Sequence, residues 1–364
     1  MRPSLARMTL RGFKTIRELK DFEPGRMTVL IGPNGAGKTN FISFFRMLSW
    51  ALNSPGDLQT HVAEQGGASM LLHDGPAKTR EVEAVLEIQT EGGSNEYGFR
   101  LVYAAGDTLM FADEWYRFRP PRRELGAGHR EPKLIDEAES GNTTARVLLA
   151  MLRRIVVHQF HNTSNTARVR NKWAADDGRW LKEDAANLSS FLFRLQDSEP
   201  KYYKRIVETV RLILPFFADF EFQPEHGRLL LRWRERGSDQ VFSASQAGDG
   251  MLRAMALVAL LQQPETDLPD VLILDEPELG LHPYAIEVLA ALIQSASLHT
   301  QVIVATQSVS LIDRFEPHDI VVVDRTGRES IFRRLNDAEL SDWRKQYTMS
   351  ELWEKNVLGG RPSR

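Results

Sequence analysis

The sequence predicts an α/β fold that combines a mixed or parallel sheet with an antiparallel β lobe and a helical insertion. Three observations lead to this fold class. In the last third of the chain, short apolar runs alternate with segments whose apolar residues have helical spacing. Three segments of alternating polarity follow one another over residues 81–118. Apolar residues in 188–213 also recur at helical spacing. Strands that alternate with helices indicate a parallel sheet, which accounts for the α/β part of the prediction.

The first predicted unit is a strand, a loop and a helix. Residues 27–31 (MTVLI) form a short apolar run of the kind found in buried strands. Phe41, Phe44 and Phe45 then recur at helical spacing. Three glycines lie between the two patterns, so the chain passes from strand to helix through a glycine-rich loop.

The remaining elements follow from the same patterns. Residues 119–146 are polar and rich in proline and glycine, which predicts an exposed loop or linker near a domain boundary. We therefore expect an N-terminal lobe (1–150), a mainly helical insertion (151–240) and a C-terminal lobe (241–364). The predicted strands are 81–89, 97–103, 110–118, 227–234, 271–275, 301–305 and 319–324, and the predicted helices are 188–195, 206–213, 250–261 and 284–294.

Composition narrows the class of protein. The 364 residues are 42% hydrophobic, enough for a sizeable core, and 46 basic against 49 acidic residues give a net charge of −3. No overall basic field therefore draws the chain to nucleic acid or anionic membranes. The chain has no cysteine, no signal peptide pattern and no apolar run of transmembrane length, so we expect a cytoplasmic protein with no membrane partner.

The glycine-rich loop carries the first chemical motif. Gly32, Gly37, Lys38 and Thr39 satisfy G-x-x-x-x-G-K-[ST], the P-loop or Walker A motif, between a strand and a helix. Backbone N–H groups of such a loop surround phosphate oxygens, the lysine reaches the β- and γ-phosphates, and the hydroxyl holds Mg²⁺. The alternative is an ordinary glycine-rich turn. The expected nucleotide-binding residues of the loop are Asn34, Gly35, Ala36, Gly37, Lys38, Thr39 and Asn40.

The second motif is VLILDEPELGLHP, residues 271–283, which has the form of a Walker B motif. An apolar strand that ends in Asp275 and Glu276 brings two carboxylates to the edge where parallel sheets bind ligands. Asp275 suits Mg²⁺, directly or through water, and Glu276 suits orientation or deprotonation of the attacking water. Capping of a helix or surface ion pairs are the alternatives. Together the two motifs predict a P-loop NTPase with ATP and Mg²⁺ as cofactors.

These motifs resemble those of a known group of proteins. The Walker A motif, LDEPELGLHP and the start LRGFKTI look like the ABC-class ATPase heads of SMC, RecF and OLD-type proteins. FHNTSNTARVR (160–170), ATQSVSLIDRF (305–315) and ELWEKNVLGGRP (351–362) are similar to a family of bacterial AAA/ABC-type ATPases of about this size. The resemblance covers residue 8 to the C-terminus. It implies the ABC-ATPase head type of the P-loop fold.

The resemblance also implies a homodimer that sandwiches ATP between the P-loop of one subunit and a signature segment of the other. Related sequences read L-S-D-G-T-L-R where this chain has residues 247–253, so Gly248, Asp249 and Gly250 are the expected signature residues. The signature serine is replaced by Gly248, which leaves backbone N–H groups and the helix N-terminus as donors. Ser245 is a substitute donor, or else a turn serine.

Three further site residues are implied by position in the family pattern. Gln307 stands where ABC proteins usually carry a switch histidine; it can hydrogen-bond the γ-phosphate and water but takes up no proton near neutral pH, so catalysis is expected to be slow. Gln159 is the expected Q-loop residue, which senses Mg²⁺, or else a polar residue on a strand. Lys14 is expected to approach the nucleotide, or else is a solvated lysine. His158 and His161 fit structural roles better than a metal site.

The biological task is less well defined by the sequence. We expect an ATP-gated dimer that acts on DNA or controls a separately encoded nuclease or other effector, in antiphage defence or DNA repair. Trp173 and Trp180 lie among basic residues and could stack on nucleic acid, or else belong to a solvated basic face. These basic residues are Arg168, Arg170, Lys172, Arg179 and Lys182. The alternative function is a nucleotide-binding scaffold with little turnover. The tail 351–360 could dock on a partner or pack on its own head.

Overall fold

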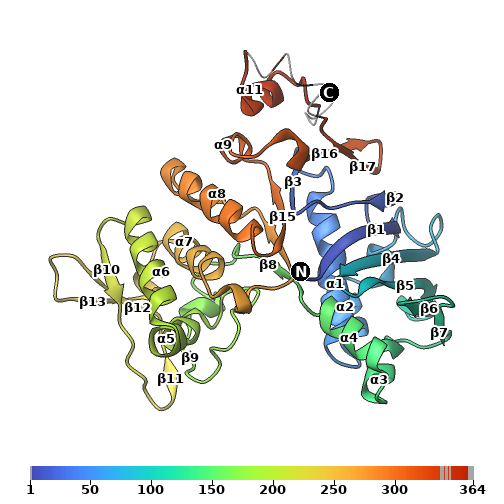
Figure 1. Cartoon of the computed structure of the whole chain (residues 1–364), viewed down its shortest axis with the longest axis horizontal. Coiled ribbons are helices and arrows are strands. Elements are labelled where there is room, and N and C mark those ends of the chain that lie inside the picture. Colours follow the sequence, from blue (N-terminus) through green and yellow to red (C-terminus); the bar gives the residue numbers. More distant parts are fainter. Residues whose placement is uncertain (1, 337–339, 341–342, 344–345, 360–364) are drawn as a thin grey trace.

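The computed structural model describes residues 2–336, 340, 343 and 346–359. A six-stranded sheet lies at the centre, and the chain adds an antiparallel lobe on one side of it and an insertion on the other (Figure 1). The sheet confirms the predicted α/β fold class. In the described residues no helix combines the length and the apolar character that a membrane span requires.

The central sheet has the order β17-β16-β3-β15-β14-β8. All neighbours are parallel except β17, which pairs antiparallel to β16. Every residue of β3, β14 and β15 is buried, which agrees with their continuous apolar sequences. Its strands are β3 (Met27–Ile31), β8 (Ile155–His158), β14 (Val271–Asp275), β15 (Gln301–Thr306), β16 (Ile320–Thr326) and β17 (Glu329–Arg334).

The N-terminal antiparallel sheet has the order β2-β1-β4-β5-β6-β7. The alternating burial along β4 shows why its sequence alternates in polarity: Val82, Ala84 and Leu86 face the core, and the residues between them face outward. Its strands are β1 (Ser4–Phe13), β2 (Ile16–Phe22), β4 (Glu81–Thr90), β5 (Gly93–Ala104), β6 (Thr108–Arg117) and β7 (Arg123–Gly126).

Two helices occupy the segment that the sequence predicted as an exposed loop or linker, so that prediction was wrong. Leu134, Ile135 and Leu148 are buried against the antiparallel lobe, and the Asn142 side chain accepts a hydrogen bond from Ala145 N–H at the start of the second helix. These helices join two others in the N-terminal part. The four are α1 (Lys38–Asn53), α2 (Asp57–Glu64), α3 (Lys133–Glu139) and α4 (Thr143–Leu152).

The insertion contains helices and small sheets, in contrast to the mainly helical segment expected from its sequence. The predicted strand 227–234 is divided in the structure, because residues 228–229 pair with β9 whereas residues 232–235 join another sheet. The elements are β9 (Trp173–Ala174), α5 (Leu188–Ser198), α6 (Pro200–Ile213), β10 (Phe217–Phe220), β11 (Arg228–Leu229), β12 (Arg232–Glu235) and β13 (Val241–Ser243).

Two apolar cores cover the two faces of the central sheet. Residues alternate between them along each strand: Val29 and Ile31 pack with α5–α8, whereas Leu30 packs with α1 and the antiparallel lobe. The C-terminal helices are α7 (Asp249–Leu261), α8 (Pro283–Ser297), α9 (Val309–Ile312) and α11 (Met349–Glu354). Short 3₁₀ turns span Ala68–Met70, Arg168–Arg170, Ala244–Gln246, Glu265–Asp267 and Pro317–Asp319. The carboxyl ends of β3, β14 and β15 therefore meet at one sheet edge, where both predicted motifs lie.

Candidate functional site

The loop between β3 and α1 has a backbone that requires glycine. Gly35 and Gly37 have φ values of 80° and 114°, in a backbone region that residues with a Cβ atom rarely adopt. A Cβ at Gly37 would also lie 2.0 Å from Ser330 Oγ. No side chain caps the first turn of α1, so its N–H groups are free to bind an anion at this end of the helix. The loop has the form of a phosphate cradle.

A cavity of about 140 Å³ opens over this loop. Glu276 from the end of β14 faces the loop residues across it. The structure therefore brings the two sequence motifs together, although Thr39 and Glu276 are 237 positions apart in the sequence. Ala36 is the exception among the loop residues, because it is buried beneath the loop. The cavity is lined by Pro33, Asn34, Gly35, Gly37, Lys38, Thr39, Asn40 and Glu276.

Lys38 is buried at the centre of the loop. Its Nζ donates to the carbonyl oxygens of Gly32 (2.6 Å) and Pro33 (3.2 Å), so the ammonium group is held against the backbone of the loop. Burial lowers the pKa of Lys38, and the carboxylates of Glu276 and Asp275 act in the opposite direction. A buried ammonium group with acidic neighbours is well placed to meet the negative charge of a triphosphate.

Lys14 and Asn40 lie beside the loop and contact protein groups. Lys14 Nζ donates to Ser43 Oγ (2.7 Å), one helical turn beyond Thr39 on α1, and burial lowers its pKa. Asn40 Nδ2 donates to Thr15 Oγ1 (2.7 Å). That hydroxyl also lies 2.6 Å from Ser330 Oγ, which donates to the Ala36 carbonyl oxygen. Thr15 in the turn before β2 and Ser330 in β17, which lie near opposite ends of the chain, thus hold the loop through hydrogen bonds.

Asp275 ends β14 and is almost fully buried. Its Oδ2 accepts a hydrogen bond from Gln159 Nε2 at 2.9 Å, so the expected Q-loop residue does lie beside the Walker B aspartate. This contact follows from the parallel pairing of β8 with β14, which places residue 158 opposite residue 274. Burial raises the pKa of Asp275, and the nearby His161, Arg46 and Lys38 oppose that shift.

Glu276 has an unusual backbone conformation for a non-glycine residue, with φ at 43°. Such a conformation costs on the order of 1–3 kcal/mol and is typical of functional sites. The Glu276 N–H donates to the Ala305 carbonyl oxygen (2.8 Å), which holds the strained turn on β15. Gln307, the expected switch residue, donates from Nε2 to Glu276 Oε1 at 3.1 Å, a contact that would orient the carboxylate.

The residues present fit a divalent cation at this edge. Asp275 Oδ1 is buried and has no hydrogen-bond partner among the described residues, which is the state expected of an oxygen that binds a metal ion. Thr39 lines the P-loop cavity, as does Glu276, the residue after Asp275, and Thr39 would supply a second oxygen ligand. The Gln159 Oε1 accepts from Arg46 Nη2, and its amide N–H groups face Asp275 and His161. Gln159 therefore fits a role in holding Asp275 better than direct ligation.

Sequence reasoning missed Arg46 and Thr306. Arg46 lies two turns along α1 from Thr39 and donates to Gln159. Thr306, the last residue of β15, donates its hydroxyl to Glu278 Oε1 and accepts from Ser308 N–H (2.9 Å). Glu278 is itself buried within this chain. The pattern T-Q directly after an apolar strand was the available signal for Thr306.

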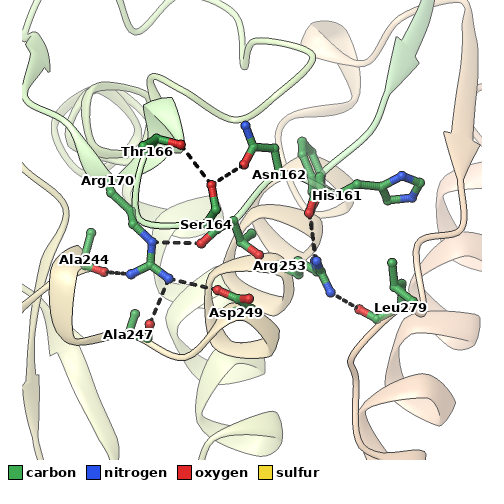
Figure 2. A network of polar contacts seen from close by, with 12 residues as sticks. His161, Asn162, Ser164, Thr166, Arg170, Ala244, Ala247, Asp249, Arg253 and Leu279 are labelled. Carbon is green, nitrogen blue, oxygen red and sulfur yellow. Dashed lines mark hydrogen bonds and ion pairs between the residues drawn. The ribbon is translucent and has the colours of Figure 1, made fainter.

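The signature segment begins helix α7 (Figure 2). Gly248 is the N-cap of α7 with φ at −68°, and a Cβ built there meets nothing within 4 Å. Asp249 Oδ1 accepts from Arg170 at 3.0 Å. Gly250 packs so closely that a Cβ would lie 2.5 Å from the Gly280 carbonyl oxygen. These three residues are absent from the lining of the described P-loop cavity of their own subunit.

The two histidines near Gln159 have different surroundings. His161 Nε2 contacts the Asp275 carbonyl oxygen (2.9 Å), and its Nδ1 accepts from Gln159 Nε2 (2.7 Å). His158 is buried at the end of β8, and burial lowers its pKa to about 4. It is therefore neutral at physiological pH.

The exposed basic residues near Trp173 and Trp180 in the insertion are already paired with acids, and Arg168 and Arg179 also lie over the tryptophan rings. Trp180 is 46% exposed, and the Arg179 guanidinium lies over its ring at 4.5 Å. Arg168 lies over the Trp173 ring at 4.8 Å. Four ion pairs hold the basic groups: Arg168–Asp184 (3.1 Å), Lys182–Asp177 (3.1 Å), Arg179–Asp267 (3.8 Å) and Lys172–Glu225. The side chain of Arg170 is buried, so it is not part of this basic surface.

The described part of the C-terminal tail packs on its own head. Leu352, Trp353 and Leu358 are buried and join the core on the α8 side of the central sheet. Ser350 Oγ donates to Asp313 Oδ2 (2.6 Å) at the end of α9. Of the two alternatives for the tail, packing on the head fits the structure.

The central sheet, the glycine cradle and the paired carboxylates define a P-loop NTPase of the ABC-ATPase head type. Residues 27–313 match the family model AAA_21, described as "AAA domain, putative AbiEii toxin, Type IV TA system". The chain belongs to this family. No curated protein matches the sequence significantly.

Solved SMC head domains share the fold. One, an SMC head bound to the C-winged helix domain of ScpA, has a TM-score of 0.63 at 16% identity over 92% of this chain and 99% of its own. A second, from Pyrococcus furiosus, carries an extended coiled coil and is bound to the C-terminal domain of ScpA. Its TM-score is 0.62 at 14% identity, over 94% of this chain and 99% of its own. A third, from Pyrococcus yayanosii, has a TM-score of 0.56 at 13% identity, over 94% and 100%.

Proposed function

We propose that this chain binds ATP with Mg²⁺ and hydrolyses it as an ATP-gated homodimer. One observation carries the proposal: Lys38, the adjacent pair Asp275 and Glu276, and Gln307 come from three separate segments and meet at the carboxyl edge of the central sheet, where Lys38 and Glu276 line the P-loop cavity. A binding site alone would need the cradle and the lysine. The additional pairing of Glu276 with Gln307 supports a site that also activates water.

Each residue has a role in the proposed reaction. The loop N–H groups and Lys38 bind the phosphates, and Thr39 and Asp275 would hold Mg²⁺, which neutralises phosphate charge when bound. Glu276 accepts the proton of the attacking water. Gln307 orients the Glu276 carboxylate through the 3.1 Å hydrogen bond and cannot itself store a proton. Turnover is therefore expected to be slow.

The signature segment supports a second subunit at the site. Gly248, Asp249 and Gly250 lie at the N-terminus of a 13-residue helix, and they do not line the described cavity of their own subunit. In the proposed dimer they close the cavity of the partner, with Gly248 N–H in place of the missing serine hydroxyl. Exposed Leu279 and Tyr284, which follow Walker B, flank the same edge and would be covered by dimerisation.

We further propose that the dimer controls a partner effector or acts on DNA, in antiphage defence or DNA repair. The family description names a toxin of a toxin–antitoxin system, and the similar SMC heads are bound to a protein partner. DNA binding by the insertion would require phosphates to displace the acids from Arg168, Arg179 and Lys182. A separately encoded effector is therefore the favoured output.

A scaffold with little turnover is the second candidate. Gly248 and Gln307 favour it, because each replaces a side chain that supports hydrolysis in ABC heads. Such a protein would bind ATP, dimerise and present a surface to its partner without cleaving the nucleotide in the process.

Phosphate release from purified protein with ATP and Mg²⁺ tests the proposal. The wild type should release phosphate, while Lys38→Ala and Glu276→Gln should each lose most of that activity for different reasons. Lys38→Ala should also lose ATP binding in calorimetry, whereas Glu276→Gln should keep it. Full ATP binding without phosphate release in the wild type, with and without DNA, would support the scaffold instead.

A further inference from the structure

Arg170 is a buried arginine that neither nucleotide chemistry nor a DNA surface explains. Its side chain is only 7% exposed, in contrast to that of Arg168, which is 57% exposed two residues earlier in the same 3₁₀ turn. Burying a guanidinium group is costly unless its donors are satisfied by well-placed acceptors. The partners of Arg170 therefore indicate what the residue does.

The guanidinium group of Arg170 reaches two separate segments (Figure 2). Its Nε donates to the Thr163 carbonyl oxygen at 2.9 Å, within the loop that follows Gln159. Its Nη1 donates to the Ala244 carbonyl oxygen, and Nη2 donates to the Ala247 carbonyl oxygen (3.1 Å) and to Asp249 Oδ1 (3.0 Å). Three of these four acceptors lie in residues 244–249, which we call the signature turn.

The loop that carries Arg170 begins at the Mg²⁺ side of the site. Gln159 Nε2 donates to Asp275 Oδ2 (2.9 Å), and His161 contacts the Asp275 carbonyl oxygen (2.9 Å). From His161 to Arg170 the loop then leads directly to the signature turn. Residues 159–170 therefore contact the Walker B aspartate at one end and the signature turn at the other.

A second arginine holds the same loop from the helix. Arg253 on α7 donates to the carbonyl oxygens of Phe160 (3.0 Å) and His161 (2.8 Å), and also to that of Leu279 (2.9 Å) in the loop after Walker B. Arg253 fixes the body of α7, whereas Arg170 fixes the turn before the helix. Gly248 has no side chain with which to fix the turn, so the bonds from Arg170 to its neighbours Ala247 and Asp249 add to the turn's own bond from Ala247 N–H to the Ala244 carbonyl oxygen (3.2 Å).

We propose that Arg170 is a positioning residue that holds the signature turn in the conformation needed to bind the nucleotide of the second subunit. It also links that turn to the Mg²⁺ side of its own subunit through residues 159–163. The inference rests on the proposed sandwich dimer. Arginine suits this role because its planar fork presents five N–H donors in fixed directions and so reaches four acceptors in two segments, whereas the ammonium group of a lysine has only three donors.

The test measures dimerisation separately from ATP binding. Arg170→Gln and Arg170→Lys are each placed in the Glu276→Gln protein, and Arg168→Gln, a nearby exposed arginine, is the matched control. In saturating ATP and Mg²⁺, analytical ultracentrifugation should show a dimer dissociation constant at least tenfold higher for Arg170→Gln. The value should be intermediate for Arg170→Lys and unchanged for Arg168→Gln. Monomer affinity for ATP, measured by calorimetry at low protein concentration, should stay within twofold.

Mixed dimers show which subunit needs the arginine. One subunit carries Lys38→Ala, so that it binds no ATP and contributes only its signature turn; the other carries Glu276→Gln and binds ATP. Arg170→Gln should weaken this dimer when it is in the Lys38→Ala subunit and have little effect when it is in the ATP-binding subunit. A general loss of fold would weaken the dimer from either side.

The outcomes separate the inference from the proposed dimer. If the parent Glu276→Gln protein fails to dimerise in ATP, the proposed function is wrong. If the parent dimerises and Arg170→Gln dimerises within twofold of it, or loses ATP affinity and dimer affinity equally, the positioning role is overturned. Thermal melting monitors the fold. If Arg170→Gln unfolds, the dimer affinity of Arg170→Lys in the mixed dimers is used instead, and the same outcomes support or overturn the positioning role.

Discussion

Replacing Thr306 with valine removes one hydroxyl from the buried end of β15 and leaves the shape of the side chain nearly unchanged. That hydroxyl joins the Walker B loop to the switch segment, because it donates to Glu278 Oε1 and accepts from Ser308 N–H (2.9 Å). Glu278 is buried, which raises its pKa, while the hydrogen bond from Thr306 opposes that shift. The substitution therefore leaves a buried carboxyl group with one partner fewer.

The expected cost follows from these contacts. A hydrogen bond to a charged group contributes about 1.5–3 kcal/mol, and an unsatisfied Ser308 N–H adds about 1 kcal/mol, so Thr306→Val should lower the free energy of unfolding by about 2.5–4 kcal/mol. Glu278 Oε2 already lacks a partner among the described residues, so little compensation is available from a second acceptor site. Gln307, the next residue, should also lose its fixed position, and phosphate release should fall.

Equilibrium unfolding in urea measures this cost, with Thr326→Val on an exposed strand end as the matched control. The control should change the free energy of unfolding by less than about 0.5 kcal/mol. A double-mutant cycle with Glu278→Gln should show a coupling energy of about 1 kcal/mol or more. Strictly additive effects, or a loss below about 1 kcal/mol for Thr306→Val, would refute the reasoning.

Three further predictions concern separate parts of the site. The pKa of His158 is lowered to about 4 in the folded protein, so the unfolded chain binds more protons at this residue than the folded chain as pH falls. The wild type should therefore lose about 2 kcal/mol of stability from this group between pH 7.5 and 5. Urea unfolding of His158→Leu should show a correspondingly smaller loss over the same pH range. Gly250→Ala should cost about 1–3 kcal/mol in the same assay because its Cβ would lie 2.5 Å from the Gly280 carbonyl oxygen, and an unchanged midpoint would contradict that contact. Gly248→Ser has open space and should tighten the ATP-dependent dimer by about five- to thirtyfold, or about 1–2 kcal/mol, in ultracentrifugation. An unchanged constant would mean either that backbone donors already satisfy the phosphate or that the signature turn does not face it.

Local patterns were sufficient for most of the fold. The strands at residues 27–31 and 271–275 were predicted at the bounds that the structure shows, because continuous apolar runs next to glycine or acidic residues have few other interpretations. Residues 133–152 were missed although Leu134, Ile135, Leu148 and Leu149 have helical spacing, since the surrounding prolines and glycines suggested a loop. The break between β11 and β12 depends on pairing with distant strands, which no local pattern records.

The site was predictable where chemistry follows a motif and was not where it depends on tertiary contacts. Lys38 and Glu276 came from motifs, and Gln159 came from its position in the family pattern. Arg46 was missed because its contact with Gln159 joins residues far apart in the sequence. Arg170 was read as a surface residue, since a basic and aromatic sequence does not show that three of its acceptors are in residues 244–249.

Sedimentation of Glu276→Gln protein with and without ATP and Mg²⁺ tests most directly whether two chains close around nucleotide. The protein should be monomeric without nucleotide and dimeric in saturating ATP, and addition of Lys38→Ala to both subunits should abolish the dimer. A monomer in saturating ATP, or a dimer that forms equally well without nucleotide, would contradict an ATP-gated sandwich.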